Sequence, residues 1–220
     1  MDRSSLLLRS TLIQGPPERG DPLTWNAMFI LYGCYSRLAT NTTFLEEGFS
    51  LSTGQAICQG LKFTYAHLEL RDIDMRSTRA AFNSFTDIVR RGIKFISQTG
   101  CWSRGLEHAL GGFQAGSFLV NWVRKVEEAG DQATPEEVQL FEEVRGLLEE
   151  GDIQIYPESL AATLARSCIQ LMESAWIWGV TPLMGEAYRL YTEEVLGNRA
   201  AIMDVEPVLL EDEQGSEYGD

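Results

Sequence analysis

The chain has 220 residues, 44% of them hydrophobic, and its 32 acidic and 18 basic residues give a net charge of −14. This length allows one sizeable core, and the hydrophobic fraction argues against wholesale disorder. The negative charge disfavours non-specific binding to nucleic acids or anionic membranes, because the long-range field of the protein repels them.

Glycines and prolines are dense in residues 1–22, which predicts a flexible leader before the folded domain. Beyond it, apolar residues at helical spacing predict three amphipathic helices, separated by a polar loop and a charged connection. In chain order we expect a helix at 23–38, a loop at 41–54, a helix at 53–70, a connection at 71–79 and a helix at 77–98.

Residues 101–123 carry no charged side chain from Ala109 to Val123. About 15 uncharged residues make roughly 22 Å of helix, which is too short to cross a bilayer. A helix that is apolar on nearly every face is normally buried on nearly every face. We therefore expect 101–123 to be the buried central helix of an all-α, single-domain bundle.

The remaining elements complete a bundle of about seven helices without a sheet. Residues 127–156 are strongly acidic and predict a surface helix that begins near Pro135. Further helices are expected from Pro157 to Trp178 and from Met184 to Leu196. The folded domain then spans 23–199, and an acidic, disordered tail follows at 200–220.

No pattern of catalytic or metal-binding residues stands out. The two histidines and four widely spaced cysteines lack the spacing of a zinc site, so we expect free thiols, no metal and no cofactor. Glu107 and His108 are adjacent, point in different directions on a helix and make a poor acid–base pair. Without a signal peptide or an anchor-length apolar run, we expect a non-enzymatic, cytoplasmic protein.

Six basic residues between positions 71 and 94 form the only cluster suited to phosphate, and they are interspersed with Phe82 and Phe85. One interpretation is an RNA-binding face. The other is the basic polar face of an amphipathic helix, which balances the acidic segment near residue 140. The cluster consists of Arg71, Arg76, Arg79, Arg90, Arg91 and Lys94.

Two short strings of residues resemble the homology motifs of the Bcl (B-cell lymphoma) apoptosis regulators, including divergent viral members. The first runs F-x-x-I-V from Phe85, then G-C-W-S-R-G-L at 100–106 and Gly111-Gly112. The second is Trp176-Ile177, a break at 179–182, Tyr188 and Leu190-Tyr191. The chain departs from the family by Cys101 and Ser103 in the first motif. It also needs an acidic insertion at 127–156 and lacks a C-terminal anchor.

The resemblance implies a surface groove that binds the amphipathic helical peptide of a pro-apoptotic protein. It implies that Arg104 pairs with an Asp of the partner, because a guanidinium fork suits a carboxylate. An alternative function is an all-helical viral structural protein (coat, nucleocapsid or matrix), which self-assembles and contacts RNA through the arginine cluster. The groove would be lined by Phe85, Ile88, Phe95, Leu106 and Tyr191.

Overall fold

A computed structural model of the chain shows an all-α fold, as predicted. The described residues are 31–32, 34–35, 40–66, 69–70, 73–91, 106–151, 153–155, 159–174 and 179–197. Within them lie seven α-helices and no β-strand. The helices are α3 (Thr43–Ser50), α4 (Gly54–Tyr65), α5 (Met75–Arg91), α7 (Leu106–Ala129), α8 (Pro135–Glu150), α9 (Leu160–Ser174) and α10 (Thr181–Tyr191), with a 3-10 turn at Gly130–Gln132 and a π-helix at Thr192–Leu196.

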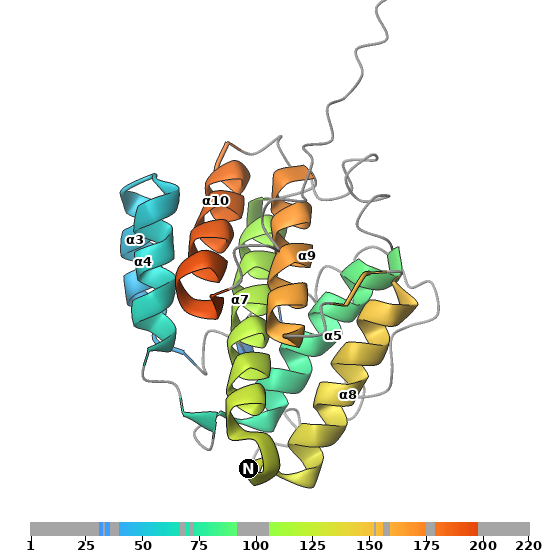
Figure 1. The fold of residues 1–220 in the computed structure, drawn as a ribbon. Coiled ribbons are helices and arrows are strands. Elements are labelled where there is room, and N and C mark those ends of the chain that lie inside the picture. Colours follow the sequence, from blue (N-terminus) through green and yellow to red (C-terminus); the bar gives the residue numbers. More distant parts are fainter. Residues whose placement is uncertain are drawn as a thin grey trace, which may run out of the picture.

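Helix α7 occupies the centre of the bundle (Figure 1). Residues 112–123 form an unbroken buried run, and α5, α8 and α9 all pack against this helix. An uncharged helix is stable in water only when its neighbours cover it, so the prediction of a buried central helix is confirmed. The helix continues to Ala129, whereas residues 101–105 lie outside the described part of the chain.

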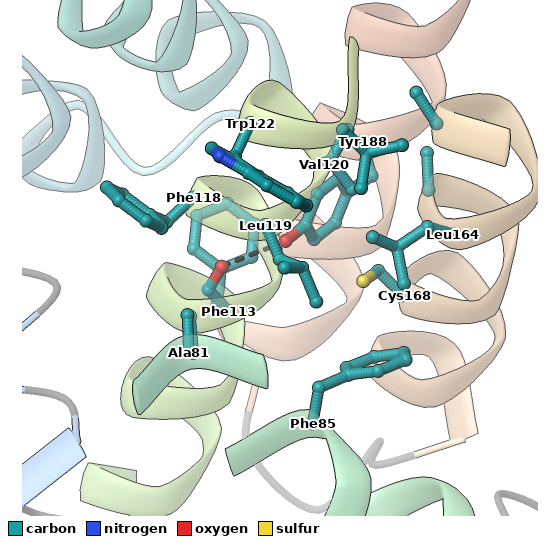
Figure 2. Close-up of a cluster of buried hydrophobic side chains, with 14 of the residues drawn as sticks. Ala81, Phe85, Phe113, Phe118, Leu119, Val120, Trp122, Leu164, Cys168 and Tyr188 are labelled. Atoms are coloured by element: carbon teal, nitrogen blue, oxygen red, sulfur yellow. Dashed lines mark hydrogen bonds between the residues drawn. The ribbon is translucent and has the colours of Figure 1, made fainter. Parts of the chain in front are cut away.

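The core is shared between the central helix and the helices around it. Figure 2 shows side chains from α5, α7, α9 and α10 directed into one buried cluster. Gly116 of α7 makes room there, because a Cβ atom at this position would lie 2.8 Å from Cys168 Sγ and 2.9 Å from Tyr188 Oη. The glycine therefore lets two neighbouring side chains reach the backbone of α7.

Helices α3 and α4 form a tight antiparallel pair against α10 (Figure 1). The loop predicted at 41–54 is wrong, because Thr43–Ser50 is helical and buries Leu45 and Gly48. Asn41 helps to start this helix, since its Oδ1 accepts a hydrogen bond from the Thr43 N–H at 3.2 Å. The polar residues that suggested a loop thus lie at the ends of two short helices, where such residues are favoured.

Helix α8 begins where Pro135 predicts it. Thr134 and Glu137 form a capping box, and Pro135 occupies the first turn. The helix is acidic toward the solvent, but it also buries an apolar stripe on the shared core. The buried apolar residues of α8 are Leu140, Val144, Leu147 and Leu148.

Other predicted boundaries shift by a few residues. Helix α4 ends at Tyr65 rather than near Leu70, and α9 begins at Leu160 rather than at Pro157. Pro182 lies in the first turn of α10 and does not interrupt a helix. The leader at 1–22, most of the helix expected at 23–38 and the tail at 200–220 fall outside the described residues. None of the described helices combines the length and apolarity of a bilayer span.

Candidate interaction surfaces

Three of the residues predicted to line a peptide-binding groove lie in the core. Phe85 and Ile88 are each 1% exposed, and Tyr191 is 2% exposed. A partner helix reaches only side chains at the surface, so these three line no surface groove in this structure. Arg104 and Phe95 lie outside the described residues, and Leu106 is described only by its backbone at the start of α7.

Two arginines of α5, Arg79 and Arg90, face the acidic helix α8. Arg79 forms an ion pair with Glu143, and Arg90 Nε lies 3.3 Å from Glu150 Oε1. The Arg79 guanidinium also lies 6.0 Å from the centre of the Phe82 ring. The partners of both arginines are acidic side chains of the segment near residue 140, as the second interpretation of the basic cluster expects.

Of the other four members of the basic cluster, the structure describes the side chain of Arg76 alone. Arg76 is exposed at the start of α5. Arg71 and Lys94 lie outside the described residues, as does the side chain of Arg91. Of the cluster, Arg79 and Arg90 are thus each directed at a carboxylate of α8.

A line of buried polar groups joins α10 to the central helix. The Tyr188 hydroxyl donates to the Phe113 carbonyl at 2.8 Å and lies 2.9 Å from Ser117 Oγ. One turn further on, the Tyr191 hydroxyl donates to Asn121 Oδ1, and Asn121 Nδ2 donates to the Ser117 carbonyl at 2.8 Å. Figure 2 shows Tyr188 directed at α7 beside Phe113 and Cys168.

Burial keeps these hydroxyl and thiol groups protonated, and the hydrogen bonds of the hydroxyls hold α10 against α7. Burial raises the pKa of Tyr191 to about 12, and it raises the pKa of Tyr188 well above the ordinary range. Burial also raises the pKa of the Cys168 thiol to about 12, which leaves it protonated and a poor nucleophile at neutral pH. Sequence analysis missed this network, although Ser117 and Asn121 are polar residues within the uncharged run.

An open cleft of about 290 Å³ lies where the end of α7 meets the start of α9. Glu127 caps the start of α9. Its carboxylate accepts hydrogen bonds from the Leu160 N–H at 2.5 Å and from the Ala161 N–H at 3.3 Å. The nearby Arg124 is 2.7 Å from Glu128 Oε1. The charged groups of this cleft are thus already paired within the protein. In the part of the chain that the structure describes, no group of acidic, His or Cys side chains has the arrangement of a metal site.

Large apolar side chains are exposed mainly on the α3–α4 pair. Phe44 is 42% exposed, Phe63 is 59% exposed and Leu51 is 70% exposed. The rings of Phe44 and Phe63 have their centres 5.7 Å apart. Val138 of α8, at 46% exposure, stands apart from them in sequence and in the fold.

Comparison with known families corrects the interpretation of the sequence. A model of the fungal transcription factor C-terminal domain matches residues 71–190, which is more than half of the chain. No curated protein and no solved structure matches the chain. The match overturns the Bcl resemblance, and with it the apoptosis-regulator and viral structural functions. The two Bcl-like strings are short sets of aromatic, apolar and glycine residues, and any helical bundle needs such residues to pack its core. Since the matched region runs from the approach to α5 to the end of α10, the chain belongs to the fungal transcription factor C-terminal domain family.

Proposed function

We propose that this chain is a non-enzymatic regulatory domain that controls transcription through contacts with other proteins. Membership of a transcription factor family supports a regulatory role. The family also favours the nucleus as the place of action, instead of the cytoplasm expected from the sequence. The contact with DNA would then belong to another part of the transcription factor or to a partner.

The observation that carries this proposal is the pairing of two arginines of α5 with carboxylates of α8. Arg79 and Arg90 form ion pairs with Glu143 and Glu150. Each guanidinium would have to give up its carboxylate partner before it could bind a phosphate. The net charge of −14 acts in the same direction, because it repels a polyanion at long range. Both observations favour a protein rather than DNA as the binding partner.

A tethering experiment tests the regulatory role. The full chain is fused to an unrelated DNA-binding domain, and expression of a reporter with the matching binding sites is measured in a fungal host. We expect reporter expression to differ from that given by the DNA-binding domain alone. The control fusion carries Trp122→Asp, which places a charge at a fully buried core position and should abolish the effect. Equal expression from the wild-type and control fusions would contradict the proposal.

A direct binding measurement tests the exclusion of DNA. We expect no change in fluorescence anisotropy when the chain is added to a labelled mixed-sequence duplex at physiological salt. Binding whose affinity falls steeply with salt would show that the domain neutralises phosphates, and it would overturn this part of the proposal. The variant Arg90→Ala would then identify whether the α5 arginines are responsible.

A further inference from the structure

The outer face of the α3–α4 pair carries three exposed apolar side chains, Phe44, Leu51 and Phe63, among polar ones. Phe44, Glu47 and Leu51 are three and four residues apart, so they share one side of α3 and its C-terminal end. All three are exposed, as are Gln59 and Phe63, which are four residues apart on α4. The paired rings of Phe44 and Phe63 thus lie at one end of this face, and Leu51 lies at the other.

This face is held rigid by the fold beneath it. A Cβ atom at Gly60 would lie 2.5 Å from the Phe44 carbonyl oxygen, so the two helices are in direct backbone contact. Lys62 forms an ion pair with Glu194 in the π-helix after α10, and Phe49 packs edge-on against Phe113 of α7 with ring centres 5.6 Å apart. Exposed aromatic side chains on a preorganised surface lose little conformational entropy when a partner binds.

The charge around this face selects the kind of partner. Glu46 and Glu47 are exposed beside Phe44, and the one lysine of α3 and α4, Lys62, is already paired with Glu194. A second copy of the chain would bring another net charge of −14 to an acidic surface, which is unfavourable. A basic partner has the complementary charge.

We propose that the outer face of α3–α4 is the site at which the domain holds its regulatory partner, and that the partner offers a basic amphipathic helix. Phe44 and Leu51 are seven residues apart, which is about 10 Å along a helix. Two apolar anchors two turns apart on a partner helix have the same spacing, and an amphipathic helix binds by laying such anchors against an apolar surface. Residues 40–66 precede the region matched by the family model, and the inference rests on the proposed regulatory function.

The test uses three fluorescein-labelled peptides of about five helical turns, or ~18 residues. The first has leucine and tryptophan anchors at helical spacing and lysines on the opposite face. The second replaces every lysine with glutamate, and the third keeps the lysines but scrambles the anchors. We expect the full chain to bind only the first peptide in fluorescence polarisation.

Matched variants separate this surface from general attraction to an acidic protein. Phe44→Ser with Phe63→Ser should weaken binding about tenfold or more, whereas Val138→Ser, at an exposed apolar site on α8, should leave it unchanged. Glu47→Lys should weaken binding, whereas Glu149→Lys makes the same change in net charge on α8 and should not. Equal losses for the two members of either pair would overturn the proposal.

Two further measurements complete the design. Sedimentation of the wild-type chain should show a monomer; a dimer that the Phe44→Ser, Phe63→Ser variant dissociates would assign the face to a second copy and overturn the proposed partner. The Phe44→Ser, Phe63→Ser variant is also tested in the tethered reporter, which separates a failure of the proposed surface from a failure of the proposed regulatory role. Reporter regulation that survives the loss of peptide binding would reject this surface but keep the regulatory role. Peptide binding without any reporter effect of the wild type would reject the regulatory role alone.

Discussion

At the scale of the residue, two glycines in helices predict opposite responses to the same substitution. At Gly60 of α4 a Cβ atom would meet the backbone of α3, 2.5 Å from the Phe44 oxygen and 3.0 Å from Leu45 Cα. Backbone atoms cannot rotate away, so we expect Gly60→Ala to lower the free energy of unfolding by about 2–3 kcal/mol. Urea denaturation followed by circular dichroism measures this change.

The matched control is Gly146→Ala in α8. Nothing lies within 4 Å of a Cβ atom at Gly146, which is exposed in the middle of a helix. Alanine restricts the unfolded chain and favours the helix, so this variant should be more stable by about 0.5–1 kcal/mol. A loss of stability at both positions would mean that the close contact of α3 and α4 is not what makes Gly60 necessary.

A third glycine, Gly48, helps to explain why a loop was predicted where α3 lies. Intrinsic propensity counts Gly48 as unfavourable in a helix, and the surrounding Asn, Thr and Ser residues favour turns. A Cβ atom at Gly48 would lie 2.7 Å from the Ala56 carbonyl oxygen, so the position serves a close helix crossing. Sequence periodicity cannot report such a contact, because it depends on a partner backbone.

At the scale of the element, the start of α9 depends on a side chain from another helix. Glu127 of α7 accepts hydrogen bonds from the Leu160 and Ala161 N–H groups and from the Ser159 hydroxyl. A carboxylate at a helix N-terminus satisfies donors that have no partner within the helix and interacts favourably with the helix dipole. We expect Glu127→Ala to destabilise the protein by about 1–2 kcal/mol, measured by urea denaturation.

Glu128→Ala is the control for that change, because it removes the same charge from the next position. Glu128 pairs with Arg124 and Lys125 at the surface, and such exposed pairs contribute about 0–1 kcal/mol. Equal effects of the two variants would argue that the cap contributes nothing beyond the loss of one charge.

Strong local patterns predicted the existence of α5, α7 and α8, whereas α3 was missed and the start of α9 was misplaced. The apolar repeat of α5 and the long uncharged run of α7 identified both helices, since each pattern directly reflects burial. The capping box that starts α8 is local, and Pro135 revealed it. The start of α9 was misplaced at Pro157, although Ser159 caps the helix locally by accepting a hydrogen bond from the Ala162 N–H at 3.1 Å. The second cap, Glu127, is 33 residues away from Leu160 and leaves no local pattern.

At the scale of the whole molecule, the pattern of burial determines the fold class but not the function. Any all-α domain of this size needs an apolar helix at its centre, and unrelated families meet this need with similar short strings of residues. The Bcl-like strings include Phe85, Tyr188 and Tyr191, all of which are buried. The exposed residues Phe44 and Phe63, which carry the proposed interaction, show no periodic signal that separates them from core aromatics.

Two buried thiols make the stability of the whole domain sensitive to alkaline pH. Burial, followed by the charge of Glu194, raises the pKa of Cys58 from its ordinary 9.0 to about 11, and burial raises the pKa of Cys168 from 9.0 to about 12. Between pH 9 and the raised values, the folded chain keeps protons that the unfolded chain releases. Their stabilising contribution is complete below pH 9, and it should fall by about 1.4 kcal/mol per pH unit for each thiol above it.

Urea denaturation under reducing conditions at several values between pH 8 and 10 measures this slope, before most tyrosines ionise in the unfolded chain. The variants Cys58→Ala and Cys168→Ala provide the control, because each removes one titrating group whatever its effect on absolute stability. Each should reduce the slope by an equal amount, and by less than half, because burial also raises the pKa of Tyr65, Tyr188 and Tyr191, which begin to contribute toward pH 10. A slope that is unchanged in both variants would show that the two thiols titrate alike in the folded and unfolded chains. Water would then reach Cys58 of α4 and Cys168 of α9 in the folded chain, whereas both side chains are buried in this structure.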